Sequence, residues 1–234
     1  MKKVLCLVFL LVILLCGCSQ DNVFTKKENG NIISDSGVEY AHLANEGVLY
    51  YLGDLEFVGS IEGEEKTSRH LGLSYQTGMF AIKDADNDNI LIRHAPDNEW
   101  FSVYRKTSLP SFVFSVDNCI RLEFVSGIGN TESDVTHTTC GDGIVEASEI
   151  AEFLSDVRSQ KDPCEAGLYD LIMKPDGMFE NCYVYGVVYG FFAEEPNLVV
   201  RLDVTSYNDL AYSISIDDKE YVLPVEWLQK LENK

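Results

Sequence analysis

The sequence predicts an α+β protein, mainly antiparallel β-sheet, with one principal helix at about 144–158 and a short C-terminal helix. Short runs rich in β-branched and aromatic residues recur along the chain, separated by Gly, Asn and Asp. Only one long segment places apolar residues at helical spacing. The predicted strands do not alternate with helices, which argues against a doubly wound parallel sheet.

The first strands are predicted from short apolar runs bounded by turn-forming residues. These runs are 48–52, 55–61, 79–83, 90–94, 100–105 and 120–125. The runs 79–83 and 90–94 are predicted to pair, because the segment between them is rich in Asp and Asn. Residues 127–143 contain many Gly, Thr and Asp residues and are predicted to form a long loop.

The principal helix is predicted at 144–158 from an apolar face. That face consists of Ala147, Ile150, Ala151, Leu154 and Val157, while acidic residues occupy the opposite side. Asp142 stands where an N-terminal cap and a favourable contact with the helix dipole are expected.

The C-terminal part returns to strands. The run 182–192 is apolar at both alternating sets of positions, which is typical of a strand in the middle of a covered sheet. Gly186 and Gly190 lie on one face and leave room for another element, for which the 144–158 helix is the natural candidate. The run 198–204 is predicted to pair back, 211–216 and 220–223 to form a hairpin, and Pro224 to open a helix through Leu231.

The N-terminus has the organisation of a secretory signal. Lys2 and Lys3 precede an unbroken apolar run at 4–15. As a helix this run would be about 18 Å long, too short for a hydrocarbon core of about 30 Å. The sequence Leu15-Cys16-Gly17-Cys18 follows and resembles the lipobox of bacterial lipoproteins. The resemblance implies cleavage between Gly17 and Cys18 and attachment of diacylglycerol and a fatty acid such as palmitate to Cys18.

This signal predicts the organisation of the rest of the chain. Residues 1–17 form the signal peptide, the polar segment 18–36 a flexible tether, and 37–234 a single α+β domain, or two β-rich halves around the 144–158 helix. The lipid would hold the protein on the cell membrane or the outer membrane, exposed outside the cytoplasm. The sequence leaves open the number of membranes and the oligomeric state.

The composition is strongly acidic, with 18 basic and 38 acidic residues and a formal charge of −20. Removing Lys2 and Lys3 with the signal leaves about −22. Such a surface repels nucleic acid, which argues against a nucleic-acid partner. The charge suits solubility near an anionic envelope, and the alternative is a protein or other cationic partner, or divalent cations.

Four cysteines remain beyond the signal and the lipid site: Cys119, Cys140, Cys164 and Cys182. An even number in an exported domain predicts two disulfides, with three possible connectivities. The pairing of Cys140 with Cys164 is disfavoured, because a helix about 22 Å long separates them. Buried free thiols are the alternative, and no CxxC spacing indicates a metal site.

Asp84, Asp86 and Asp88 alternate as in the first half of a calcium loop. Asn89 replaces the glycine and Ala95 the glutamate that such a loop requires, so a solvated hairpin turn is the better interpretation. Asp142-Gly143 and Glu149 resemble the second half of an EF-hand loop, but a capped helix start explains them. The sequence therefore predicts no metal and no cofactor.

No HxH, HExxH or GxSxG motif is present, so no catalytic residue is assigned. Tyr183, Tyr185 and Tyr189 share one face of a strand and would stack on sugars if exposed, although core packing is the favoured interpretation. The leading hypothesis is a lipid-anchored envelope protein that binds a partner or ligand. The alternatives are an envelope hydrolase acting on wall polymer and a solute-binding lipoprotein of a transporter.

Overall fold

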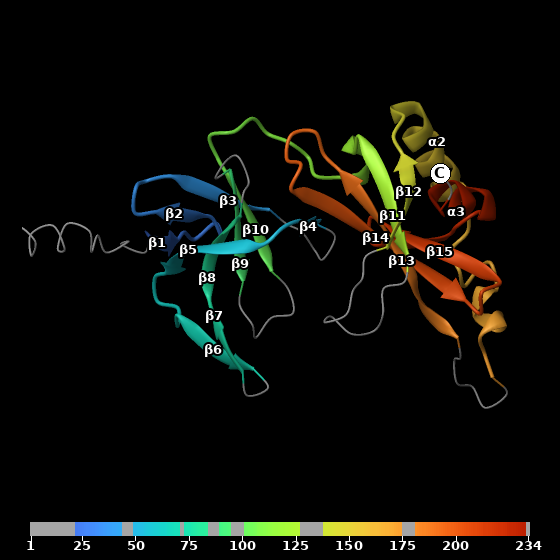
Figure 1. Ribbon diagram of the computed structural model, residues 1–234, viewed down its shortest axis with the longest axis horizontal. Helices are drawn as coiled ribbons and strands as arrows, with labels where there is room; N and C mark the ends of the chain where they lie inside the picture. The colour runs from blue at the N-terminus through green and yellow to red at the C-terminus, as the bar shows by residue number, and fades with distance from the viewer. Residues whose placement is uncertain are drawn as a thin grey trace, which may run out of the picture. The chain divides into compact units, whose positions relative to one another are not determined.

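The computed structural model in Figure 1 describes residues 22–43, 49–70, 73–83, 89–94, 101–126, 138–174 and 181–232. Strands account for 48% of the structure and are accompanied by one main helix and a short C-terminal helix, which confirms the predicted α+β class. The chain divides into two compact units. The first contains the described residues up to Leu43 and those in Leu55–Leu109, and the second those in Ala44–Asp54 and from Pro110 onwards.

The first unit is a closed β-barrel (Figure 1). In barrel order its strands are β1 (Asn22–Lys26), β2 (Ile32–Ser34), β3 (Glu39–Leu43), β10 (Ser102–Lys106), β9 (Ile90–His94), β8 (Gly78–Ile82) and β5 (Leu55–Ile61). All neighbours are antiparallel except β1 and β5, whose parallel pairing closes the barrel. A separate hairpin is formed by β6 (Thr67–His70) and β7 (Leu73–Gln76). The predicted pairing of the 79–83 and 90–94 runs is confirmed by β8 and β9.

The barrel begins inside the segment that the sequence predicted as a tether. That prediction is wrong for residues 22–34, because β1 and β2 are barrel strands. Phe24 and Ile32 are 2% and 0% exposed and join a cluster of buried residues with Tyr40 and Met79. A buried aromatic ring in an otherwise exposed strand is enough to anchor β1, because side chains alternate between the barrel interior and the solvent.

The second unit is an antiparallel sheet. Its strands, in sheet order, are β12 (Thr138–Ile144), β11 (Arg121–Ser126), β13 (Cys182–Phe191), β14 (Leu198–Tyr207), β15 (Ala211–Ile216) and β16 (Lys219–Val222), and β4 (Leu49–Tyr51) also pairs with β14. The apolar run at 182–192 is confirmed as a central strand, since β13 pairs with β11 on one side and β14 on the other.

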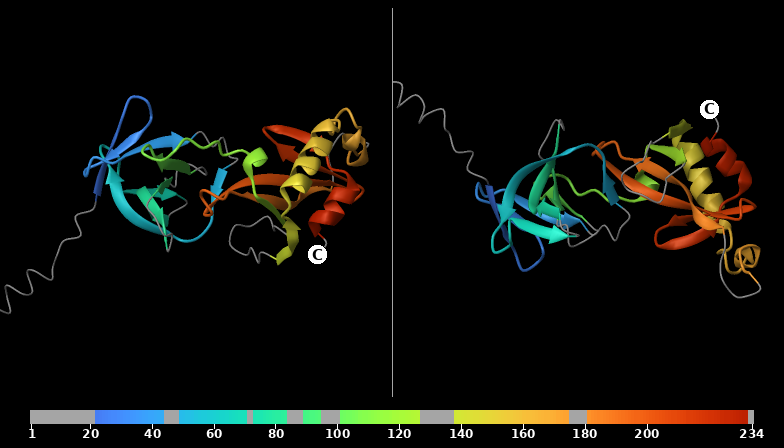
Figure 2. Two further views of the ribbon diagram at one scale, coloured as in Figure 1. Left: turned by 90° about the horizontal axis from the view of Figure 1, so that it is seen from above. Right: turned by 60° about the horizontal axis from the view of Figure 1, so that its bottom comes forward.

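Two helices lie side by side against this sheet, as Figures 1 and 2 show. They are α2 (Ala147–Ser159) and α3 (Val225–Glu232). The Phe153 and Trp227 rings meet edge to face, with centroids 5.4 Å apart. The indole N–H of Trp227 donates to Oδ2 of Asp156 at 2.7 Å, so the helix pair is held by a ring contact and a directed hydrogen bond.

The principal helix begins three residues later than predicted. Its N-cap is Glu146, so the assignment of Asp142 as the cap is wrong. Residues 138–143, predicted as loop, and Ile144, predicted to begin the helix, form β12, because their backbone pairs with β11. Phe153 is fully buried, whereas Ala147 and Ala151 of the predicted apolar face are exposed.

The two β13 glycines do not make room for the helix. A Cβ at Gly186 would lie 2.5 Å from Cζ of Phe124, and one at Gly190 would lie 2.5 Å from Sγ of Cys119. The close approach that was predicted is therefore real, but it is made by side chains of β11 and of the segment before it.

None of the helices in the described part of the chain is long and apolar enough to cross a bilayer. Gly17 and Cys18 lie outside the described residues, and so do Asp84, Asp86 and Asp88. The lipidation site and the calcium-loop resemblance therefore stay predictions.

Candidate functional site

Two of the three tyrosines that the sequence places on one strand face belong to one cluster at the beginning of β13. Tyr183 is 42% exposed, and Tyr185 is half-buried. Tyr189 lies farther along the strand, opposite Arg201. The prediction that these rings serve core packing is therefore wrong for Tyr183.

A β-bulge at Tyr185 shapes this cluster. The pairing of β13 with β14 shifts register between Val184 and Gly186, which leaves Tyr185 as the extra residue. The Tyr185 ring stacks on Phe124, with centroids 6.0 Å apart, and lies 4.9 Å from the Tyr212 ring. The bulge thus anchors one ring in the core while its neighbours stay at the surface.

The turn between β14 and β15 supplies an acidic residue to the same place. Asn208 and Asp209 both have φ of +57°, and the N–H of Leu210 donates to the carbonyl of Tyr207 at 3.1 Å. This is the type I′ geometry of a tight hairpin, which Asn and Asp tolerate. The Ser206 hydroxyl donates to Oδ1 of Asp209 at 3.1 Å and accepts from its backbone N–H, so the carboxylate is fixed.

Two tyrosine hydroxyls donate to carboxylates. Tyr183 donates to Asp209, and Tyr185 donates to Glu232 at the end of α3. We call these residues, together with Tyr212, the tyrosine cluster. Within the described residues, both carboxylates accept from neutral hydroxyls, and neither is paired with a Lys or an Arg.

The ionisation of the cluster follows from these contacts. The hydrogen bond to Asp209 raises the pKa of Tyr183, and the hydrogen bond to Glu232 raises the pKa of Tyr185. Burial, followed by the charge of Asp209, raises the pKa of Tyr212. The hydroxyls therefore remain protonated at neutral pH, and the cluster places two carboxylate side chains beside three aromatic rings.

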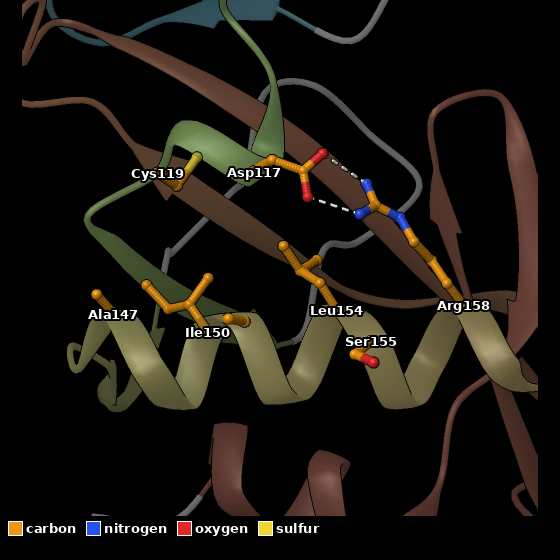
Figure 3. Close-up of a pocket in the computed structure, with 8 residues that line it drawn as sticks. Asp117, Cys119, Ala147, Ile150, Leu154, Ser155 and Arg158 are labelled. Atoms are coloured by element: carbon orange, nitrogen blue, oxygen red, sulfur yellow. Dashed lines mark hydrogen bonds and ion pairs between the residues drawn. The ribbon is translucent and has the colours of Figure 1, made fainter.

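A different hollow lies between the short 3₁₀ helix η1 (Val116–Asn118) and α2 (Figure 3). It has a volume of about 240 Å³, and Arg158 closes one end by donating to both carboxylate oxygens of Asp117, at 2.6 and 3.0 Å. Arg158 also donates to Asp217 at 2.6 Å. Cys119 lines the hollow, but burial raises the pKa of its thiol to about 12. The thiol is protonated at neutral pH and is a poor nucleophile.

The predicted disulfides do not form among the described cysteine side chains, because Cys119, Cys164 and Cys182 are free thiols. The side chain of Cys140 lies outside the described residues. Geometry excludes one pairing. Cys119 lies against Gly190, which is eight residues along β13 from Cys182, a separation of about 26 Å in a strand. No group of three or more His, Cys, Asp or Glu residues with metal-binding geometry occurs in the described part of the chain.

Sequence reasoning found Tyr183 and Tyr185 but missed Tyr212 and the two carboxylates. The Asn208-Asp209 pair between two apolar runs was the available signal for a tight hairpin, whereas Glu232 meets Tyr185 across 47 residues. What the cluster offers chemically is aromatic faces beside fixed negative charge, the arrangement that attracts a cationic group. No protein-family model, no curated protein and no solved structure matches the chain.

Proposed function

We propose that this protein is a lipid-anchored envelope protein whose folded part binds a cationic partner through the tyrosine cluster. The lipobox-like sequence ending in Cys18 supports the anchor. The formal charge of −20 supports attraction of a cationic partner to the protein as a whole. The cluster supplies the local chemistry.

One observation carries the binding proposal: Asp209 and Glu232 are held by tyrosine hydroxyls and have no basic partner among the described residues. An ammonium or guanidinium group placed beside either carboxylate would pair with it and lie against the rings. A cation on an aromatic face contributes about 0.5–2 kcal/mol, and more when it is desolvated. The exposed side chain of Leu210, in the same turn as Asp209, adds apolar contact for the stem of a Lys or an Arg.

The binding test uses an octalysine peptide as the probe, with an octaglutamate peptide as the charge control, in isothermal titration calorimetry on the protein from residue 19 onwards. Asp209→Asn and Tyr212→Ala are expected to weaken binding by about tenfold each. Asp218→Asn is the matched control, because Asp218 is also an exposed turn aspartate with positive φ but lies in the next hairpin. Equal affinities for Asp209→Asn and Asp218→Asn would show that only net charge attracts the peptide.

The anchor is tested separately. Cells grown with radioactive palmitate are expected to label the wild-type protein but not the Cys18→Ala variant, and Cys16→Ala is the matched control that should keep its label. Labelling of Cys18→Ala, or a mature N-terminus at another residue, would contradict the lipid assignment. The labelling result does not affect the peptide titration, so the lipid anchor and the cationic site are tested independently.

A further inference from the structure

A second hollow lies between the segment that follows α2 and strand β16. Its volume is about 420 Å³, and its lining consists of Asp162, Pro163, Tyr169, Lys219, Glu220 and Tyr221. None of these residues belongs to the tyrosine cluster. We call this hollow the β16 pocket.

Both carboxylates of the β16 pocket are fixed by the surrounding structure. Oδ1 of Asp162 accepts from the backbone N–H groups of the two residues after Pro163, at 2.8 and 3.0 Å. Oε1 of Glu220 accepts from the hydroxyls of Tyr207, at 2.9 Å, and Ser213. Tyr207 and Ser213 are 1% and 0% exposed. These bonds engage one oxygen of each carboxylate and hold both side chains in place.

One aromatic wall of the pocket is also held in place. Tyr169 lies in the 3₁₀ helix η2 (Leu168–Leu171), and its ring meets Tyr207 edge-on, with centroids 5.7 Å apart. Leu168 and Ile172 on either side are buried against the same Tyr207. A ring anchored on one side by the core and lining a hollow on the other is a preorganised contact surface.

The mixed chemistry of the lining selects the class of ligand. The lining carries both signs of charge, because Lys219 lines the same hollow as Asp162 and Glu220. A neutral ligand rich in hydroxyl groups satisfies all three, since each hydroxyl both donates to a carboxylate and accepts from the ammonium. Two tyrosine rings supply apolar surface for the C–H face of a sugar ring. We propose that the β16 pocket is a saccharide-binding site.

The test measures binding of two uncharged probes, maltotetraose and the tetramer of N-acetylglucosamine, by saturation-transfer NMR and titration on the protein from residue 19 onwards. At least one probe is expected to bind the wild type. Tyr221→Ala should weaken it by about tenfold or more, and Tyr221→Phe should retain most of the affinity because the ring remains. Tyr221 is half-buried on the outermost strand, and thermal melts confirm that each variant folds.

Tyr212→Ala on the neighbouring strand is the matched control. It should leave saccharide binding unchanged while weakening the octalysine peptide, and Tyr221→Ala should do the reverse. Failure of both probes to bind up to their solubility limits, or equal affinities for the wild type and a folded Tyr221→Ala variant, would overturn the saccharide site. Neither result bears on the cationic site, because the two sites are read out by different probes.

Discussion

Replacing Gly190 by alanine is expected to destabilise the second unit, and the structure identifies the atoms responsible. The new methyl group would lie 2.5 Å from Sγ of Cys119 and 2.7 Å from Cγ1 of Val200. Both distances are far below an ordinary van der Waals contact distance. Overpacking of this kind lowers the free energy of unfolding by about 1–3 kcal/mol. Because Cys119 and Val200 are 7% and 2% exposed, neither side chain can move into solvent to relieve the clash.

The same geometry predicts a rescue. Cys119→Ala alone removes a buried sulfur atom and should cost about 1 kcal/mol through the small cavity it leaves. In the double variant the new methyl group at position 190 occupies part of that space. The two changes should therefore be less destabilising together than the sum of the singles, by about 0.5–3 kcal/mol. The contact with Val200 persists, so the rescue is partial.

Urea unfolding followed by Trp227 fluorescence in a Trp100→Phe background measures these free energies, since Trp227 is buried in the second unit. The wild type, the two single variants and the double variant are compared with one common value for the dependence of the unfolding free energy on urea concentration. Additivity within about 0.3 kcal/mol would refute the reasoning, because it would mean that the position 190 methyl group and the Cys119 sulfur do not compete for space.

Three further outcomes follow from the second unit. Trp227→Phe should lower the free energy of unfolding by about 1–3 kcal/mol, because Asp156 loses its indole donor; thermal unfolding measures this. Burial raises the pKa of the Cys119 thiol from 9.0 to about 12, so Cys119 should resist iodoacetamide in the folded protein. The free energy of unfolding should fall as the pH rises from about 9 to 12, because only the thiol of the unfolded chain ionises in that range. Gly143→Ala should prevent folding of the second unit, as judged by circular dichroism, because its Cβ would lie 1.7 Å from the carbonyl oxygen of Leu122.

The sequence predicted the strands whose apolar residues are continuous and missed those that are anchored by one or two side chains. The run at 182–192 was recognisable because nearly every residue is apolar. In β1 only Phe24 is buried, with two exposed residues on either side, so a search for apolar runs assigns the segment to a tether. Strand β12 has the composition of a Gly- and Thr-rich loop. It is a strand because its backbone pairs with β11, and composition does not reveal that pairing.

The candidate site was predictable only in part, because its members come from distant parts of the sequence. The alternation of residues along β13 grouped Tyr183 with Tyr185. Nothing in the local sequence shows that Glu232, at the end of α3, accepts a hydrogen bond from Tyr185. Cysteine spacing has the same weakness. It allowed three disulfide connectivities, whereas distances along β13 separate Cys119 from Cys182. The local sequence pattern predicts secondary-structure elements, whereas the site depends on contacts between those elements.

The backbone at Asp209 gives a way to separate the stability of the turn from its role in binding. Asp209 and Asp218 occupy similar positions in consecutive hairpins, with φ of +57° and +60°. Glycine adopts this conformation without the strain of a side chain, so Asp218→Gly should be neutral or stabilising by about 0.5 kcal/mol. Asp209→Gly relieves the same strain but removes the acceptor of the Tyr183 and Ser206 hydroxyls.

Asp209→Gly should therefore abolish most of the octalysine affinity while changing the melting temperature little, and Asp218→Gly should leave the affinity intact. The reason is that glycine keeps the positive-φ backbone of the turn but lacks the carboxylate that would bind the cationic peptide. Parallel thermal melts and titrations of the two variants make the comparison. If Asp209→Gly unfolds the hairpin, or if it binds the peptide as the wild type does, then the carboxylate at this turn supports the sheet rather than a ligand.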